Sequence, residues 1–356
     1  METKSKINVC VIFGGASSEH EVSKMSVVSV LNNIDRDKYN VHMIMISKSG
    51  NWFYYDGAVE DIQSIDDPAR LGLDKAIISP DSGDRCILRF RADGGYEKYP
   101  IDVAYPVLHG KFGEDGTIQG LFEIAGLPYV GPGVLGSAVC MDKCVAKMLF
   151  KQAGLPQADW VELKINESLD IEKVESKLGY PCFIKPANAG SSVGITKAHD
   201  RAELIAGVKR AFEHDYKILI EEMMTGTETE TAVMGNLDAV AAECVGEIAP
   251  AAEFYDYEAK YEDENSKLTI PADMDAELAE KVKEYAVRAY KVCECRGLSR
   301  VDFFVDKETG DIRLNEINTL PGFTNISMYP KLWMASGLSY SEIIDRLIEL
   351  ALKRCD

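Results

Sequence analysis

Residues 300–318 read RVDFFVDKETGDIRLNEIN, and this stretch contains the clearest structural signal in the chain. Two runs rich in β-branched, aromatic and aliphatic residues lie on either side of the polar segment DKETG. Polar residues followed by glycine are typical of a turn between two strands. The sequence therefore predicts a β-hairpin with strands over residues 300–305 and 311–318.

The polar side chains of this hairpin are expected on one face. With the turn at its centre, the predicted register pairs Arg300 with Glu316 and Asp302 with Leu314. Because side chains alternate along a strand, these three polar residues and Asn318 then share a face, unless a bulge breaks the parity. Two carboxylates and an amide oxygen suit a hard cation such as Mg²⁺. A solvated face with an Arg–Glu ion pair explains the hairpin equally well.

The composition limits the class of protein. The chain has 356 residues, a length that predicts two or three domains. It contains 39 Lys and Arg against 58 Asp and Glu, a formal net charge of −19, which argues against DNA or RNA as a partner. A few lysines and a metal ion are enough to hold one triphosphate, so the acidic balance does not exclude a nucleotide.

The N-terminus and the cysteines indicate a cytoplasmic protein that does not enter a membrane. The first apolar run, in METKSKINVCVIFGG, is too short for a signal peptide and predicts a strand. No stretch reaches the ~20 apolar residues that a membrane span requires. Nine scattered cysteines without a CxxC pair predict reduced thiols. Cys293 and Cys295 lack a second pair at ligand spacing, so zinc is not expected.

The N-terminal third predicts strands that alternate with helices. A β-rich run at 7–13 ends at two glycines, and a helix with a capping-box pattern follows. Further strands are expected at 39–46 and 101–108, so the order of elements predicts a mainly parallel α/β sheet. Residues 58–95, rich in Asp, Gly and Ser, predict loops and short strands.

The rest of the chain predicts two α+β units. For the first, the patterns predict helices and strands at 135–152, 159–163, 169–178, 182–185, 202–214 and 216–221. For the second, they predict strands at 229–234 and 239–247, a helix at 276–293, the hairpin and a last helix at 341–354. The irregular stretch 249–268 is aromatic and charged, and such a long loop is more often functional than idle.

One glycine-containing loop and two lysines are candidates for anion binding. Lys185 ends a predicted strand, and the loop of small residues at 189–194 lets backbone N–H groups approach an anion closely. This is not the P-loop signature, and a tight turn with a surface lysine explains it equally well. Lys143, in MDK, is a weaker candidate because most helical lysines are solvated.

Glu19 and His109 are candidates for a ligand site in the N-terminal sheet. Each follows the carboxyl end of a predicted strand, where ligands of open α/β sheets bind. Neither loop has a GxGxxG pattern, so a dinucleotide site is not supported. For His109, a structural role with hydrogen bonds to its own loop is the simpler alternative.

Together these segments resemble the ATP-grasp superfamily and, within it, the D-alanine–D-alanine ligase family. The resemblance covers almost the whole chain and includes GGASSEHEVS (14–23), LHGKFGEDGTIQG (108–120), MDK (141–143), IKPANAGSSVGITK (184–197), EFYDYEAKY (253–261), SRVDFF (299–304) and NEINTLPGFTNISMYPKLW (315–333). It implies a three-lobed ATP-grasp fold, α/β and α+β, in which ATP binds between the last two lobes. The expected lobes are a parallel α/β domain at 1–133, a central lobe at 134–219 and a C-terminal lobe at 220–356 with the metal site and a lid loop at 249–268.

The resemblance also implies which residues bind ATP and its metal ion. Phosphate contacts fall to Lys143, Lys185, Ser192, Val193 and Lys260, and adenine or ribose contacts fall to Glu221, Met223 and Glu228. The implied ligands of Mg²⁺, or alternatively Mn²⁺, are Asp302, Glu316 and Asn318. These are the three oxygen donors that the hairpin argument had already brought together.

Further matches imply the groups that bind the amino acids and act on them. Glu19 matches the acid that receives the ammonium of the first D-alanine, and Arg300 with the N–H of Gly322 matches the oxyanion donors. Ser327 and Met328 resemble the residues that bind the carboxylate of the second substrate.

A second group of matches lies around the lid. Ser191 and Tyr261 match a hydrogen-bonded set with Glu19 that holds the lid loop over the site. His109 completes the candidate catalytic residues.

The implied activity is ATP-dependent ligation of two D-alanines through an acyl phosphate, with release of ADP and phosphate, for peptidoglycan precursor synthesis. Relatives that make D-alanyl-D-lactate have a His where this chain has Tyr261, which favours an amine nucleophile. D-Alanine–D-serine ligation, another ATP-grasp carboxylate–amine ligation, and nucleotide binding without turnover remain as alternatives. The family further implies a cytoplasmic homodimer whose other partners are small molecules.

Overall fold

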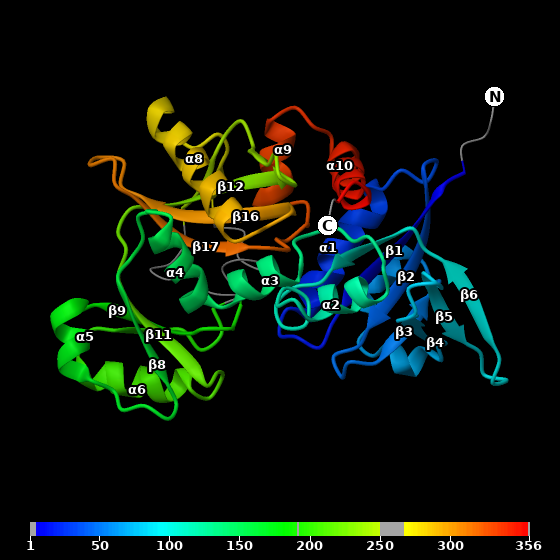
Figure 1. Ribbon diagram of the computed structural model, residues 1–356, viewed down its shortest axis with the longest axis horizontal. Helices are drawn as coiled ribbons and strands as arrows, with labels where there is room; N and C mark the ends of the chain where they lie inside the picture. Colours follow the sequence, from blue (N-terminus) through cyan, green and yellow to red (C-terminus); the bar gives the residue numbers. More distant parts are fainter. Residues whose placement is uncertain (1–4, 191, 250–266, 355–356) are drawn as a thin grey trace.

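The computed structural model describes residues 5–190, 192–249 and 267–354. Three β-sheets follow one another along the chain, each with helices packed on it (Figure 1). This arrangement confirms the predicted combination of α/β and α+β units.

The first sheet has seven strands in the order β6-β5-β4-β3-β2-β1-β7. Their bounds are β1 Ile7–Gly14, β2 Tyr39–Ile46, β3 Trp52–Tyr55, β4 Lys75–Ile78, β5 Cys86–Phe90, β6 Tyr96–Pro100 and β7 Val103–Val107. Only β1 with β2 and β1 with β7 are parallel, so the prediction of a mainly parallel sheet is wrong for β3 to β6. The link from β2 to β3 has only five residues, which permits a hairpin but no parallel crossover.

The helices of this first unit are short except for one. Helix α1 (His20–Asn33) follows β1, and α2 (Thr117–Ile124) follows β7. The stretch predicted as loops and short strands contains two 3₁₀ helices, η1 (Val59–Ser64) and η2 (Pro68–Leu71), besides β4 and β5.

The second sheet has four antiparallel strands in the order β10-β9-β11-β8. The unit consists of β8 (Trp160–Lys164), α5 (Ile171–Lys177), β9 (Cys182–Pro186), β10 (Thr196–Ala198), α6 (Arg201–Ala211) and β11 (Lys217–Glu222). Each predicted strand and helix of this unit is present, and β10 is an additional strand.

The predicted helix at 135–152 is in fact two helices. Helix α3 (Val134–Met141) ends at Asp142, and α4 (Lys143–Gln152) begins after it. Asp142 has an extended backbone, and its carboxylate accepts hydrogen bonds from the N–H groups of Cys144 and Val145, both at 3.1 Å. An N-cap inside a continuous helical pattern starts a new helix here.

The third sheet contains the order β15-β14-β12-β16-β17, with β13 paired to β12. Its strands are β12 (Thr227–Gly235), β13 (Val240–Ala241), β14 (Gly246–Ala249), β15 (Lys267–Thr269), β16 (Gly297–Val305) and β17 (Ile312–Asn318). Helices α8 (Ala276–Val292), α9 (Met328–Ala335) and α10 (Tyr340–Leu352) complete it. The predicted helices at 276–293 and 341–354 are thus confirmed.

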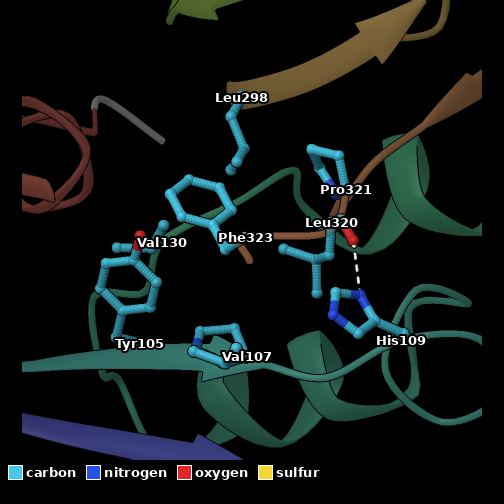
Figure 2. A pocket seen from close by; sticks show the side chains of 9 residues that line it. Tyr105, Val107, His109, Val130, Leu298, Leu320, Pro321 and Phe323 are labelled. Atoms are coloured by element: carbon cyan, nitrogen blue, oxygen red, sulfur yellow. Dashed lines mark hydrogen bonds between the residues drawn. The ribbon is translucent and has the colours of Figure 1, made fainter. Parts of the chain in front are cut away.

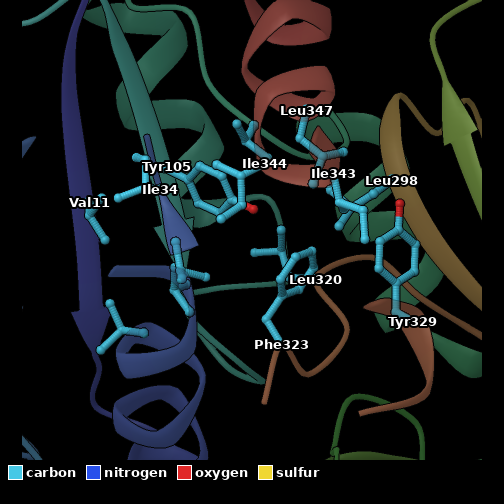
Figure 3. Close-up of a cluster of buried hydrophobic side chains, with 14 of the residues drawn as sticks. Val11, Ile34, Tyr105, Leu298, Leu320, Phe323, Tyr329, Ile343, Ile344 and Leu347 are labelled. Atoms are coloured by element: carbon cyan, nitrogen blue, oxygen red, sulfur yellow. The ribbon is translucent and has the colours of Figure 1, made fainter. Parts of the chain in front are cut away.

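A shared hydrophobic core connects the first and third units. Val11 and Tyr105 of the first sheet belong to one cluster with Phe323 and with Ile344 and Leu347 of α10 (Figure 3). All five side chains are buried. This core fixes the loop after β17 against the carboxyl ends of β1 and β7, which is where the candidate site lies.

In the ranges that the structure describes, no helix has both the length and the apolar character that crossing a bilayer requires.

Candidate active site

The hairpin formed by β16 and β17 differs from the predicted register and still brings the expected residues together. Asp302 pairs with Glu316, and Arg300 pairs with Asn318, which is a shift of two residues. A β-bulge accounts for one residue of this shift, because the next pair toward the turn is Phe303 with Leu314. The other residue of the shift arises at the turn, where Val305 pairs with Ile312. Without the extra residue, Glu316 would lie opposite Val301 on the other face. The bulge therefore places Glu316 on the same face as Asp302, whereas we expected a bulge to put them on opposite faces.

Asp302 is the centre of a buried network. Its side chain is 2% exposed, and Arg300 donates to both of its carboxylate oxygens, at 2.8 and 2.7 Å. The amide of Asn318 donates to the same carboxylate at 2.8 Å. Arg300 Nε also lies 3.0 Å from Oε2 of the buried Glu230, a residue that we did not assign from the sequence. Its position two residues after Glu228 was the available signal, since alternation places both on one face of β12.

The predicted phosphate-binding lysines lie beside these carboxylates. Lys143 Nζ donates to Ala189 O at 2.7 Å and lies 3.8 Å from Glu316. Lys185 Nζ donates to Glu221 Oε2 at 2.6 Å. Burial alone would lower the pKa of Lys185, but nearby carboxylates outweigh it and raise that pKa above its usual value. Those carboxylates belong to Glu221, Glu316 and Glu228.

The carboxylate of Glu221 has a second lysine partner, Lys147. Burial would raise the pKa of Glu221, but Lys185 and Lys147 together lower it to about 2. Lys147 was not assigned from the sequence, although it lies one helical turn after Lys143.

The remaining predicted adenine and ribose residues lie at the same boundary between the second and third sheets. Met223 is 38% exposed and follows β11, while Glu228 lies in β12. The neighbouring Glu222 lies 2.7 Å from Arg313 and accepts from the N–H of Asp159 at 3.0 Å.

Glu19 is buried at the start of α1, where two glycine loops approach its carboxylate. A Cβ added at Gly110 would lie 2.3 Å from Glu19 Oε2, and one at Gly190 would lie 2.7 Å from it. Gly110 has a φ of +68°, a further reason for glycine there. The loop that contains the predicted phosphate contacts therefore reaches the acid predicted to bind the ammonium group.

Ser192 and Val193 lie in this loop. Ser192 has a φ of +59°, and the N–H of Val193 donates to Gly190 O at 3.1 Å. Ser191, Lys260 and Tyr261, together with most of the expected lid loop 249–268, lie outside the described residues.

His109 joins the first unit to the loop after β17. Its Nδ1–H donates to Leu320 O at 2.8 Å (Figure 2). Its Nε2 lies 3.1 Å from Ser26 Oγ. Burial lowers the pKa of His109 and so favours the neutral ring. Figure 2 also shows the small apolar cavity at this boundary, lined by Tyr105, Leu320 and Phe323 among others. Both ring nitrogens of His109 thus have structural partners.

Glu114 makes a second connection between the same two loops. Its carboxylate accepts from the N–H of Gly110 at 2.7 Å and from the N–H of Leu320 at 3.0 Å. Burial, together with the charge of Glu19, raises the pKa of Glu114 to about 8. We did not assign Glu114 from the sequence, although it belongs to the GEDG segment after His109.

These contacts position Gly322 and the predicted carboxylate-binding residues. The N–H of Phe323 donates to Ser26 Oγ at 3.2 Å, so the loop is fixed on both sides of Gly322. No acceptor for the N–H of Gly322 is present in the described part of the chain. A Cβ at Gly322 would lie 2.9 Å from Ser327 Oγ, which places the predicted oxyanion donor next to the predicted substrate residue. Met328 is buried and begins α9.

The residues present fit a hard divalent cation. Two carboxylates and one amide converge on one sheet face, next to two lysines expected to contact phosphates. Across residues 5–190, 192–249 and 267–354, no three His, Cys, Asp or Glu side chains form a ligand cluster, so a zinc site at Cys293 and Cys295 gains no support. The magnesium set has only two such residues, because its third donor is Asn318.

Comparisons with known proteins show which family this chain belongs to. A family model described as "D-ala D-ala ligase N-terminus" matches residues 8–132, and one described as "D-ala D-ala ligase C-terminus" matches residues 149–349. A D-alanine–D-alanine ligase from Ruminiclostridium cellulolyticum is 52% identical, over 98% of this chain and 96% of its own.

Two solved structures have the same fold over the full chain. The VanG D-Ala:D-Ser ligase from Enterococcus faecalis has a TM-score of 0.88 and 41% identity, covering 98% of this chain and 100% of its own. The Bacillus anthracis D-alanine–D-alanine ligase complexed with ATP has a TM-score of 0.72 and 30% identity, covering 98% of each chain.

The fold and the site therefore define a ligase with the ATP-grasp fold. The chain belongs to the D-alanine–D-alanine ligase family.

Proposed function

We propose that this protein joins two D-alanine molecules, using ATP and releasing ADP and phosphate. The observation that carries the proposal is the convergence of three groups of side chains. Asp302, Glu316 and Asn318 share one sheet face, and Glu316 lies close enough to Lys185 to raise its pKa. Arg300 is on the same face, and the loop of Gly322 is anchored beside Glu19 through Glu114.

The proposed reaction has two steps. A carboxylate is a poor acyl donor, so the γ-phosphoryl group of ATP is first transferred to the carboxylate of one D-alanine. The amine of the second D-alanine, as the free base, then attacks the acyl carbon and loses a proton. The tetrahedral oxyanion collapses and phosphate leaves as the peptide bond forms.

Side chains of this protein have distinct parts in these steps. Lys143 and Lys185 hold the phosphates and stabilise the charge of the transferring group. Glu19 orients the ammonium of the first D-alanine, and Arg300 with the N–H of Gly322 stabilises the oxyanion. One well-placed donor of this kind contributes about 3 kcal/mol to catalysis.

Mg²⁺, or Mn²⁺ in its place, is part of the proposal. Asp302, Glu316 and Asn318 would hold it. When bound, such an ion neutralises phosphate charge as a Lewis acid.

A coupled assay of phosphate release tests the proposed activity. With ATP, Mg²⁺ and millimolar D-alanine we expect steady release of phosphate and formation of a dipeptide, and L-alanine should give neither. Nucleotide binding without phosphate release would instead favour a binding protein without turnover. A panel of other amino acids tests for another carboxylate–amine ligase of this fold.

D-Serine as the second substrate is the alternative that an observation favours. The structurally similar VanG protein is a D-Ala:D-Ser ligase. The 52% identity to a D-alanine–D-alanine ligase supports D-alanine. Mass analysis of the product after incubation with equal D-alanine and D-serine separates the two, and we expect mainly D-alanyl-D-alanine.

The lobe boundaries at residues 133/134 and 219/220 also belong to this proposal. Helix α4 contacts both later units. Phe150 packs in one cluster with Tyr290 of α8, whereas Cys144 packs against Leu219 of β11. Limited proteolysis with and without nucleotide tests whether these boundaries separate lobes that move.

The homodimer is inferred from the family alone, whereas the cytoplasmic location is inferred from the scattered cysteines and the short N-terminal apolar run. A ligase that consumes ATP and feeds peptidoglycan synthesis requires the cytoplasmic nucleotide pool. Light scattering of the purified protein tests the dimer, and a monomer at micromolar concentration would contradict it.

A further inference from the structure

A lysine that no sequence motif led us to assign lies behind the phosphate site. Lys147 of α4 is only 3% exposed, and its Nζ lies 2.5 Å from Glu221 Oε1. The other carboxylate oxygen of Glu221 lies 2.6 Å from Lys185 Nζ. Glu221 is itself 2% exposed, so one buried carboxylate separates two lysines.

The remaining contacts of Lys147 are with neutral groups. Its Nζ donates to Ala158 O at 3.3 Å and to Gln157 Oε1 at 3.4 Å, and it lies 5.4 Å from the centre of the Trp160 ring. Glu221 is thus the one anion that an interaction places beside Lys147 among the described residues. Burying a lysine without a counter-charge costs free energy, and the carboxylate of Glu221 offsets that cost for Lys147.

The charges of these three side chains determine what Lys185 can do. With Lys147 present, two cations share one anion, and the group carries a net charge of +1. Without Lys147, Glu221 and Lys185 would form a neutral pair. Lys185 would then have to leave the carboxylate of Glu221 in order to contact a phosphate.

We infer that Lys147 is a positioning residue for nucleotide phosphates. It balances the charge of Glu221, and the positive charge of Lys185 is thereby kept for the phosphates. Lys147 itself does not contact the nucleotide. The inference rests on the proposed function, in which Lys185 contacts the phosphates.

The test compares Lys147→Met with Lys151→Met. Lys151 is exposed, lies one turn further along α4, and is 5.8 Å from the same Trp160 ring, but it has no contact with Glu221. For Lys147→Met we expect the Kd for ADP and the KM for ATP to rise at least tenfold. The KM for D-alanine and kcat should change less than threefold. Lys151→Met should behave like the wild type.

A double-mutant cycle separates this role from a purely structural one. In a Lys185→Met background, loss of Lys147 should change the Kd for ADP less than threefold, because the residue through which Lys147 acts is gone. Lys147→Arg, which keeps the charge, should restore the Kd to within about threefold of the wild-type value. If Lys147→Met does not fold, Lys147→Gln is measured in the same cycle.

The outcomes that would overturn the inference differ from those that would overturn the proposed function. An active wild type, with unchanged ADP affinity in Lys147→Met, would contradict the role of Lys147 alone. If Lys147→Met lowers the affinity for ADP by the same factor with Lys185 and in the Lys185→Met background, the effect of Lys147 is structural. A wild type that neither binds ADP nor releases phosphate would contradict the proposed function.

Discussion

Asp302 and Glu316 face each other across β16 and β17 because the chain has one extra residue on the β17 side of the hairpin. The strand pairs change there from Phe303 with Leu314 to Asp302 with Glu316, and Asn315 is left between them. A bulge of this kind redirects the side chains that follow it. One residue thus decides that the two carboxylates share a face.

Replacing Glu316 with Gln should abolish turnover with little effect on folding. The change removes one anionic ligand of the proposed metal ion, and we expect kcat to fall at least 100-fold. Glu316 is 28% exposed and lies 3.8 Å from Lys143, so the melting temperature should change by only a few degrees. Phosphate release, Mg²⁺ titration of ADP binding and thermal unfolding measure these effects. Glu308→Gln, in the exposed turn of the same hairpin, is the control, and an active Glu316→Gln would remove the metal assignment.

Replacing Glu230 with Gln should impair the orientation of Arg300. Arg300 then loses the ion pair with Glu230 and keeps the one with Asp302, so its guanidinium is drawn toward the metal site. We expect kcat to fall 10- to 100-fold with smaller changes in KM, and stability to fall by about 1–3 kcal/mol. Steady-state kinetics and urea unfolding test this. Glu247→Gln breaks the ion pair with Lys307 in the same sheet and should leave kcat unchanged. A wild-type rate in Glu230→Gln would show that Asp302 alone orients Arg300.

Glu114 should make stability depend on pH. Its folded-state pKa is about 8, against an ordinary value of 4.5, so between these values the folded protein binds more protons than the unfolded chain. The free energy of unfolding therefore falls as pH rises through this window, and the contribution of Glu114 is lost above pH 8.

Comparing the wild type with Glu114→Gln isolates this effect. Gln cannot ionise, so we expect the variant to have similar or slightly lower stability at pH 6 and higher stability at pH 9. Urea unfolding at four pH values from 6 to 9 measures the difference between the two proteins. A difference that does not vary with pH would show that Glu114 titrates outside this range.

Replacing Gly110 with Ala should displace Glu19. The new Cβ would clash with Glu19 Oε2 at 2.3 Å. A φ of +68° also strains the backbone of any residue other than glycine at this position. We expect a strong rise in the KM for D-alanine and a lower melting temperature. Gly120→Ala, in α2, meets nothing within 4 Å and should raise stability by up to about 1 kcal/mol. Normal D-alanine binding in Gly110→Ala would mean that Glu19 is not the ammonium site.

Much of the architecture follows from local patterns in the sequence. The helix at 276–293 and the strands of the central unit have strong periodicity, and the structure confirms them. The seven-stranded sheet was less predictable, because a run of β-rich residues does not tell whether its neighbour is parallel. Asp142 is similar: its side chain caps α4 and divides a helix that periodicity alone would continue.

The residues of the candidate site also fall into two groups, those that the sequence predicts and those that only the structure reveals. Lys185, Glu19 and Asp302 could be assigned from motifs, since each belongs to a segment of characteristic residues. Glu114, Lys147 and Glu230 were not assigned, because what they do depends on distant partners, such as the N–H of Leu320, 206 residues from Glu114. Long-range partners of this kind have no local sequence pattern.

By itself, the sequence determined the chemistry available to this protein: oxygen ligands on one hairpin, lysines beside a loop of small residues, and a family resemblance over nearly the whole chain. Only the tertiary structure decided which of these groups act together. The register of β17 placed Glu316 opposite Asp302, and buried charges were paired across elements far apart in the chain. The physical reason is that strand register and the pairing of buried charges are fixed by packing between distant segments, whereas hydrophobic periodicity and turn residues act locally.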